Sequence, residues 1–551
     1  MKKPEKKIVL ILLMLVGILF IRNDMFAQIE DVPVTHPVYN FLQRMQTRGF
    51  LPHFSLSQLP LQRKDVLTAL NKIKLNNQSL EENELNSQLH FEKEFGISTS
   101  EKAVVFYSSS DSTQVFSKKM FQETDKFIYR LLDSAKSVFV RPLGSIDYFF
   151  KDSSFNQSNS TLATLGVRLY GSLGSHFGYY FQATNGRLFG GSRSLALEDN
   201  HLNRNIKFTY LNSDVDFSES HIRYEYDWFY AKIGRETQLI GSGLNHHLVV
   251  SDNSNPFDAI TLGCKFQGFE YRYIYGSLLG LPNSTNQTGA GLQIPPKYFV
   301  FHRFALRPEW GEISFWENII YSERSFDLGY LNPLSFFKSI EHALHDRDNA
   351  SMGLDWTVVP FSGLAVKGTF YLDDIIFEKI GKGFWANKMA WNIALIAALP
   401  YSIDLAAEYA RVEPYTFSHF NPQNAYSNDK ISIGSYLPPN SDEFLMKTQW
   451  WFGGRYPLYA VYSYNRHGDN IYNNYGVLTK NVGGRIDQTK RDIDSMSVTF
   501  LEGNLIKKSA LEIGGGIELI KGFSFHASLN YTKMNNGSSI GGHLNLRFED
   551  F

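Results

Sequence analysis

The stretch Phe523-Ser524-Phe525-His526-Ala527-Ser528-Leu529-Asn530-Tyr531 alternates apolar and more polar side chains. A period of two puts the odd positions on one face of a strand and the even positions on the other, and a helix cannot produce it. Similar segments recur from about residue 137 onward, often at the length of about nine to eleven residues that a tilted strand needs to cross a bilayer. Soluble strands average about five or six residues. We therefore predict an all-β transmembrane barrel, preceded by a small N-terminal α-helical region.

The alternating segments predict about eighteen antiparallel strands, and about sixteen is also compatible with the pattern. A leading strand covers 138–150 and a closing strand covers 541–551. The tightly joined pairs between them are 162–174 with 176–188, 217–226 with 228–236, 259–266 with 268–279, 298–308 with 312–323, 350–359 with 364–375, 388–399 with 402–413, 444–455 with 458–469, and 508–519 with 522–534. An even strand number is typical of bacterial outer-membrane barrels.

Short and long connections alternate along this series of strands. The short ones carry turn residues, as in Pro308-Glu309-Trp310-Gly311 and Pro360-Phe361-Ser362-Gly363. Outer-membrane barrels keep short turns in the periplasm and long loops outside. We therefore expect periplasmic termini and outward-facing loops near 189–216, 237–258, 280–297, 324–349, 414–443 and 470–507.

The first 27 residues have the pattern of a cleavable signal peptide, with four lysines before an apolar run from Ile8 to Ile21. Cleavage is expected after Ala27, and the alternative is an uncleaved membrane anchor. The domain organisation is thus a signal peptide at 1–27, a periplasmic helical region at 28–136 and an outer-membrane β-barrel at 137–551. The helices are expected from Val38, over 64–73, and through Phe95 after a capping box at Ser79-Leu80-Glu81-Glu82, with Leu85 and Leu89 on its apolar face.

The composition agrees with this class of protein. Aromatic residues make up 15% of the chain, which suits the aromatic girdles of a membrane barrel. The single cysteine, Cys264, permits no internal disulfide and no cysteine-based metal site. A formal net charge of −1 implies no bulk attraction to nucleic acid. We expect no cofactor and no metal.

Strand parity predicts which side chains enter the lumen. The expected inward residues carry both signs of charge and are Arg168, Arg223, Glu225, Lys232, Lys367, Asp373, Asp404, Glu408, His526, Asn545 and Arg547. Their neighbours, such as Ile222 and Leu405, should face lipid. A lumen of mixed sign can cross-link itself, hold a plug or bind polar sugars.

Several motifs resemble those of the Wzi-type capsule-assembly family. They are His36-Pro37-Val38-Tyr39-Asn40-Phe41-Leu42, Gly234-Arg235-Glu236, Gly241-Ser242-Gly243, Leu248-Val249-Val250-Ser251-Asp252-Asn253, Pro256-Phe257-Asp258, Tyr330-Leu331-Asn332-Pro333-Leu334-Ser335-Phe336-Phe337, Asp348-Asn349 and Gly353-Leu354-Asp355-Trp356. The resemblance implies an outer-membrane barrel of about eighteen strands that acts as a lectin for capsular polysaccharide. Its expected partners are that polysaccharide, outer-membrane lipid and the barrel-assembly machinery.

Binding a glycan without cleaving it requires carboxylates, amides and arginines for hydroxyl groups, together with aromatic faces for sugar rings. On the resemblance and on their place in long connections, the candidate glycan-binding residues are Arg235, Glu236, Asp252, Asn253, Asn332, Asp348 and Asn349. Asp252-Asn253 and Asp348-Asn349 are turn formers first and ligand contacts second. The apolar stripe from Leu334 to Leu344 is better explained by internal packing.

Other functions have weaker support in the sequence. His246-His247 near Asp252 could belong to a membrane hydrolase, but no GxSxG or HExxH motif accompanies them, so we predict that the protein is not an enzyme and has no catalytic residues. The main alternative is a porin or outer-membrane transporter for small polar solutes, because a barrel this wide conducts unless it is plugged.

Overall fold

The computed structural model describes residues 28–96, 104–105, 121, 123–133, 136–153, 156–211, 214–282 and 293–549. The expected signal peptide and the last two residues of the predicted closing strand lie outside the described residues.

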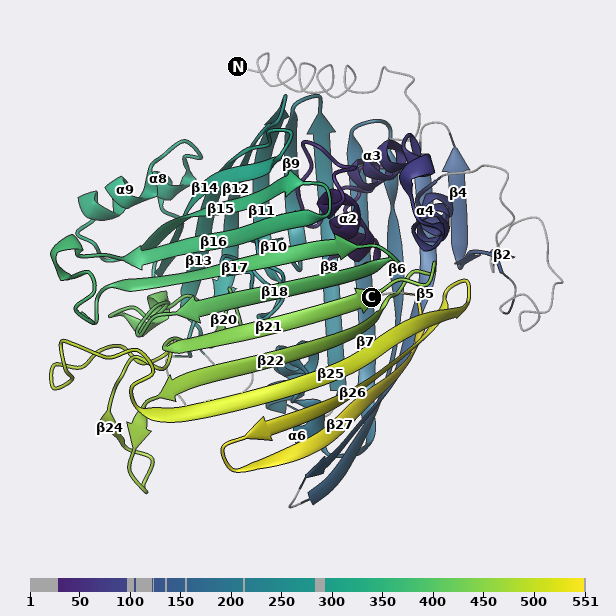
Figure 1. Cartoon of the computed structure of the whole chain (residues 1–551). Helices are drawn as coiled ribbons and strands as arrows, with labels where there is room; N and C mark the ends of the chain where they lie inside the picture. Colours follow the sequence, from purple (N-terminus) through teal and green to yellow (C-terminus); the bar gives the residue numbers. More distant parts are fainter. Residues whose placement is uncertain are drawn as a thin grey trace, which may run out of the picture.

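Eighteen antiparallel strands form a closed barrel, which confirms the predicted fold class (Figure 1). They are β5 (Lys136–Ser153), β6 (Asn156–Leu173), β7 (Phe177–Gly191), β8 (Asp214–Tyr226), β9 (Phe229–Glu236), β11 (Phe257–Phe266), β12 (Phe269–Leu279), β13 (Pro296–Leu306), β14 (Gly311–Ser322), β15 (Asn349–Phe361), β16 (Leu364–Asp374), β17 (Lys388–Leu399), β18 (Ile403–Val412), β21 (Ser441–Trp450), β22 (Leu458–Asp469), β25 (Asn504–Ile520), β26 (Phe523–Met534) and β27 (Gly537–Phe548). The ring closes where β27 pairs with β5, with Leu546 opposite Ile146. A shorter strand, β4 (Tyr129–Asp133), pairs with the first residues of β5.

The two faces of the barrel wall differ as strand parity predicts. Outward side chains such as Ile222 and Leu405 are 58% and 46% exposed and form an apolar surface suited to lipid. Most of the predicted inward residues are buried, and they are Arg168, Arg223, Glu225, Lys232, Lys367, Asp373, Asp404, Glu408 and Asn545. None of the helices among the described residues is long and apolar enough to cross a membrane.

The barrel has two different ends, which we name by their connections. The turn mouth carries the tight turns, including 307–310, 362–363 and 400–402, and the loop mouth carries the longer connections. Three helices, α2 (Val38–Thr47), α3 (Arg63–Lys74) and α4 (Glu82–Phe95), lie at the turn mouth. The Gly363 N–H donates to Thr47 O at 2.9 Å, and the Tyr401 N–H donates to Glu81 at 3.0 Å. The helical region therefore closes on the turns themselves.

Two details of the helical region differ from the prediction. Glu81, not Ser79, precedes α4, because Ser79 belongs to a short 3-10 turn, η1 (Asn77–Ser79). Leu89 is 44% exposed, whereas Phe91 and Phe95 are buried with α2 and α3. The apolar face of α4 is thus rotated relative to the predicted one, because its first turn is fixed by polar contacts with Glu84 rather than by leucines.

Three connections expected outside instead pack against the inside of the barrel wall. In the β7–β8 connection, Ala196, Leu202 and Phe208 are buried with Leu162 and Val215 of the wall. The other two fold into the lumen. We call them the first inner loop (237–256, between β9 and β11) and the second inner loop (413–440, between β18 and β21). In the first, β10 (Leu239–Ile240) pairs with β1 (Gln58–Leu59) of the N-terminal region. The Ser251 N–H donates to Ile433 O at 2.8 Å, which joins the two loops. The apolar run from Leu248 to Val250 explains the difference, since it is fully buried here and would face water outside.

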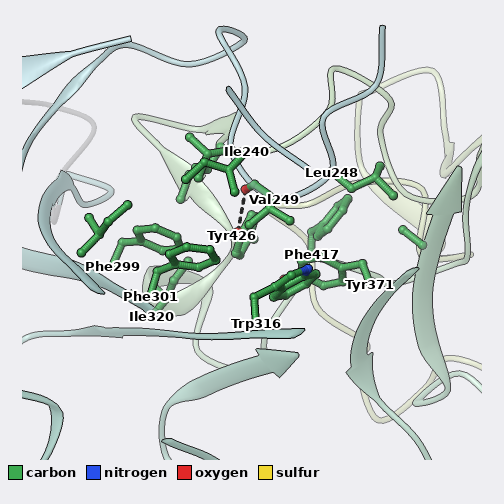
Figure 2. Packing of buried hydrophobic residues seen from close by; sticks show 14 of the residues in the cluster. Ile240, Leu248, Val249, Phe299, Phe301, Trp316, Ile320, Tyr371, Phe417 and Tyr426 are labelled. Atoms are coloured by element: carbon green, nitrogen blue, oxygen red, sulfur yellow. Dashed lines mark hydrogen bonds between the residues drawn. The ribbon is translucent and has the colours of Figure 1, made fainter. Parts of the chain in front are cut away.

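Both inner loops pack on the inside of the barrel wall. Figure 2 shows Leu248 and Val249 of the first inner loop with Phe417 and Tyr426 of the second, among wall residues that include Trp316. The Tyr426 hydroxyl donates to Val249 O at 2.7 Å, so its one polar group is satisfied inside this core. A hydrophobic plug therefore fills the loop-mouth half of the lumen along β12–β18.

Candidate functional site

A polar cavity of about 290 Å³ remains in the lumen on the side of β5–β8 and β27. We call it the luminal cavity. Its lining includes α7 (Asn200–Asn203) of the β7–β8 connection, with Asp199 and Arg204 on either side of it. The polar and aromatic side chains around it are Thr35, Ser145, Asp147, Phe149, Thr164, Thr184, Asp199, Asn200, His201, Arg204, Phe217, Thr237, Asn245, Ser251, Asp252, Asn253, Ser435, Tyr436, His543 and Arg547.

Hydrogen bonds and ring contacts hold most of these groups in place. Asp147 accepts from His543 Nε2 at 2.9 Å, and the His543 ring stacks on Phe149 with centroids 4.2 Å apart. His201 stacks on Phe217 at 3.9 Å and accepts a hydrogen bond from Arg204. Burial and the neighbouring Arg204 lower the pKa of His201 to about 3, so this ring is neutral at pH 7. The cavity is a preorganised polar site.

A second hollow, of about 460 Å³, lies at the loop mouth, and we call it the rim cleft. It is formed by α9 (Phe337–Ala343), the ends of β15, β16 and β17, and parts of the 375–387, 413–440 and 470–503 connections. The charged and aromatic residues that line it are Lys338, Glu341, His342, Asp346, Asp348, Asp373, Asp374, Trp385, Lys388, His419 and Phe420. The cleft thus combines carboxylates, amines and aromatic rings.

The charges of the rim cleft are only partly balanced. Lys388 Nζ lies 3.0 Å from Asp374 Oδ2. Asp373 Oδ2 accepts from the Phe417 N–H at 2.8 Å, and its other oxygen has no hydrogen-bond partner among the residues that the structure describes. Burial raises the pKa of Glu341 to about 7, although Lys338 opposes this shift. Burial and Lys388 lower the pKa of His419 to about 4.

The structure divides the seven predicted glycan-binding residues among separate places. Asp252 and Asn253 line the luminal cavity, and Asp252 is exposed there. Asp348 and Asn349 line the rim cleft. Asp348 is already held by Arg324, with Nη1 2.7 Å from Oδ1, and by the Tyr330 hydroxyl at 2.8 Å. Its oxygens are therefore engaged in structural contacts.

The other three predicted residues line neither cavity. Arg235 points out of the barrel and pairs with Asp258, with 3.0 Å between Nε and Oδ1. Glu236, its neighbour on the other face of β9, is buried beside Lys232 and His221. Asn332 lies outside the wall, where its side chain accepts from the Leu334 N–H at 3.1 Å. Adjacent positions on a strand cannot share a site, because their side chains leave on opposite faces.

Sequence reasoning missed Trp385, Phe420 and Lys388 of the rim cleft. The predicted long connections do not include 375–387, although Gly381 and Gly383 within it are turn residues. The available signal in the sequence was an aromatic residue within a connection between strands, as at Trp385 and Phe420.

The histidines considered for catalysis belong to the plug. His246 is fully buried, with Nδ1 2.8 Å from Ser435 Oγ and Nε2 3.2 Å from Glu443 Oε1. A Ser-His-Glu order is typical of hydrolases, but Ser435 and His246 are 2% and 0% exposed. The group ties both inner loops to β21.

Two groups of acidic and histidine side chains among the described residues are close enough to share a cation: Asp31 with His221 and Glu236, and Glu341 with His342 and Asp346. Lys232 already supplies the positive charge in the first, with Nζ 2.9 Å from Asp31 Oδ2. In the second, Lys338 Nζ lies 2.5 Å from Glu341. In both groups, therefore, a lysine ammonium already balances the charge of a carboxylate.

The geometry defines a class: an eighteen-stranded barrel of the outer-membrane type, with its lumen occupied by its own N-terminal region and inner loops. No family model and no curated protein matches the sequence. Among solved structures, the chain is similar to Wzi of Escherichia coli, an outer-membrane protein involved in group 1 capsule assembly and described as a carbohydrate-binding β-barrel. The TM-score is 0.56 at 11% identity, covering 96% of this chain and 100% of that one. The resemblance to the Wzi-type family is confirmed at the level of the fold.

Pseudomonas aeruginosa OprD and OpdQ are also structurally similar, with TM-scores of 0.40 and 0.41 at 10% and 12% identity. They cover 74% and 76% of this chain and 94% and 99% of their own. Scores this low carry no argument about the present protein.

Proposed function

We propose that this protein is an outer-membrane lectin that binds capsular or other surface polysaccharide without cleaving it and assists capsule assembly or attachment. The observation that carries the proposal is the rim cleft, where aromatic rings and charged groups meet at the loop mouth. The Wzi-like fold supports it independently.

The chemistry of the rim cleft suits a sugar chain. Phe420 and Trp385 offer ring faces against which the C–H groups of a sugar pack, while Asp374 and Lys388 offer charged partners for hydroxyl groups. The side chain of Asp374 is 47% exposed, and its ion pair with buried Lys388 holds it in place before a ligand arrives. Preorganisation of this kind reduces the entropic cost of binding. Asp252 and Asn253 in the luminal cavity are candidates for a second, deeper contact.

The orientation in the membrane is part of the proposal. A signal peptide at 1–27 exports the chain, the helical region at 28–136 lies in the periplasm, and the barrel at 137–551 opens its loop mouth to the outside. Insertion requires the barrel-assembly machinery. In this orientation the rim cleft faces the space that a capsule occupies.

The alternative is a porin or transporter for small polar solutes, and one observation favours it. Two further cavities lie in the lumen beside the helical region, one of about 170 Å³ against β16–β21 and one of about 240 Å³ against β21–β26. The larger shares Asn245 with the luminal cavity and reaches Tyr456 and Pro457 at the turn mouth. A series of cavities therefore runs beside the plug, whereas the plug itself opposes conduction.

Binding and conductance measurements separate the two functions. Phe420→Ala and Asp374→Ala should each weaken binding of the purified protein to the native capsule, and weaken capsule retention on cells. Losing one charge-assisted contact costs about 1.5–3 kcal/mol, or roughly ten- to a hundredfold in affinity. Phe452→Ala is the matched control, because Phe452 is 50% exposed at the opposite mouth.

The proposal fails if the purified protein binds no glycan on arrays containing the native capsule and a deletion strain keeps its capsule. Stepwise single-channel conductance of the wild-type protein would then establish the porin function. A lectin with a filled lumen should be nearly silent in the same assay.

A further inference from the structure

The connection between β14 and β15 covers part of the outer wall of the barrel. We call residues 323–348 the outer segment; it contains α8 (Leu328–Leu331) and α9 (Phe337–Ala343). Figure 1 shows both helices outside the ring of strands, beside β14 and β15. This position is unusual for the wall of a membrane barrel, whose outer surface normally meets lipid directly.

The outward side chains beneath the outer segment are buried. Ile274 and Trp316 point into the luminal plug, so Tyr273, Tyr275 and Ile319 on the same strands point outward. They are nevertheless at most 6% exposed and form one apolar cluster with Tyr330 and Phe337 of the outer segment. On the strands to either side, outward Ile260 of β11 and Leu354 of β15 are 49% and 47% exposed. The segment therefore covers the loop-mouth half of β12–β14 and the adjoining Ala350 of β15, while Leu306 and Ile313 nearer the turn mouth stay exposed.

The wall beneath the segment carries polar groups that lipid would leave unsatisfied. His302 Nε2 lies 2.8 Å from Glu317 Oε2, and both side chains point outward. The Phe337 ring stacks on His302 at 4.4 Å, and the Phe337 N–H donates to Glu317 at 3.3 Å. The Tyr273 hydroxyl donates to Tyr330 O at 2.7 Å. The outer segment thus shields these groups and is itself fixed to the wall.

The free surface of the segment is strongly apolar in its first half. Five large apolar side chains within residues 326–336 are exposed: Phe326 63%, Leu328 83%, Leu331 39%, Leu334 80% and Phe336 50%. The exposed residues of α9 and the turn after it are polar instead, as His342, Asp346 and Arg347 illustrate. Such a division is typical of segments that lie at a membrane interface.

We propose that the outer segment replaces the strand wall as the lipid-contacting surface over β12–β14, with Leu328 and Leu334 among the acyl chains of the outer leaflet. The polar side of α9 then lies at the level of the headgroups. The position of this surface supports lipid as its contact. The exposed apolar side chains of residues 326–336 lie between the lipid-facing wall of β11 and that of β15, so lipid would meet one continuous apolar surface. The proposal depends on the barrel's membrane setting and not on glycan binding.

Spin labels test the proposal directly. The chain has one cysteine, so Cys264→Ala provides a background for single nitroxide labels at Leu328→Cys and Leu334→Cys. The protein is reconstituted in phosphatidylcholine vesicles, and collisions with oxygen and with a water-soluble nickel complex are compared. Leu354→Cys on the outward wall is the lipid control, and Val477→Cys, 58% exposed in a loop-mouth hairpin, is the water control.

Labels at 328 and 334 should match the label at 354, with oxygen access well above nickel access. Nickel access like that of 477 would overturn the proposal. Dipolar broadening at 328 or 334 that depends on protein concentration would also overturn it, because a second copy of the chain would then occupy the surface. Each variant must first show the heat-modifiable mobility of a folded barrel.

Discussion

Arg44 of α2 and Asp404 of β18 form a buried ion pair, with 2.5 Å between Nη1 and Oδ1 and side-chain exposures of 1% and 9%. Arg44 also donates to Leu399 O at 3.1 Å and pairs with Glu84 of α4 at 2.7 Å. One side chain thus joins two helices of the N-terminal region to the end of a barrel strand. The helical region is consequently fixed to the turn mouth of the barrel and is not a separate appendage.

Replacing Arg44 should loosen the helical region while the barrel stays intact. Arg44→Ala leaves Asp404 and Glu84 buried without their shared partner, and breaking a buried pair costs about 3–5 kcal/mol. We expect faster amide exchange and proteolysis in α2–α4, with heat-modifiable mobility retained. Lys74→Ala is the control, because its exposed pair with Glu92 should contribute about 0–1 kcal/mol. If α2–α4 were equally protected from amide exchange and proteolysis in both variants, Arg44 would not be what holds the helical region to the barrel.

The plug should contribute measurably to barrel stability. Trp316 is fully buried against Tyr371, with ring centroids 5.2 Å apart, and it covers Gly353 of β15, where a side chain would clash with its ring. Trp316→Ala should cost about 3–5 kcal/mol through lost burial and the remaining cavity. The temperature at which the folded band disappears on an electrophoresis gel measures this loss. The outward-facing Trp391→Ala should lower that temperature less, since lipid fills the space, and a larger effect there would argue against the plug.

Epitope tags should distinguish the two mouths and the buried loops. A tag beside Tyr475, which is 92% exposed in the β23–β24 hairpin (Ile471–Tyr472 and Leu478–Lys480), should be labelled on intact cells. A tag at Gly363 or Gly522 should be labelled only after the outer membrane is opened. A tag at Tyr426 should reduce folded yield, because the second inner loop is inside the lumen. Labelling at Gly363 on intact cells would reverse the proposed orientation.

Acid should release the N-terminal region from the wall. Burial alone would raise the pKa of Asp31, but Lys232 and Arg223 outweigh it and hold this pKa below its usual range. A carboxyl whose pKa is depressed on folding contributes stability above its unfolded pKa of about 3.9, and that contribution is lost as pH falls toward the folded value. Glu94, whose pKa is held well below its usual range despite burial, chiefly by Arg455, acts in the same direction.

Protease sensitivity of residues 28–65 should therefore increase as the pH falls below about 4. Asp31→Asn should weaken docking at pH 7 and flatten this dependence, because the substituted amide does not titrate. Unchanged pH dependence in Asp31→Asn would assign the effect to other carboxyls.

The candidate site was only partly predictable from the sequence. Asp348 and Asp252 were predicted as glycan contacts, and they line the rim cleft and the luminal cavity respectively. Trp385 and Phe420 of the rim cleft were not predicted, and the predicted Arg235 points out of the barrel, away from both cavities. A residue type suited to sugars does not identify a site unless its neighbours across the fold are known.

The sequence by itself determined the strands, their alternation of faces and the N-terminal helices. These features follow from local periodicity: in Ile403 to Tyr409, each side chain's face depends only on its parity along the strand. Only the tertiary structure decided that the first inner loop enters the lumen, that the outer segment covers β12–β14, and that Arg44 meets Asp404 360 positions away. Those outcomes depend on burial and charge pairing between distant parts of the chain, whose energies exist only when the barrel brings the partners together.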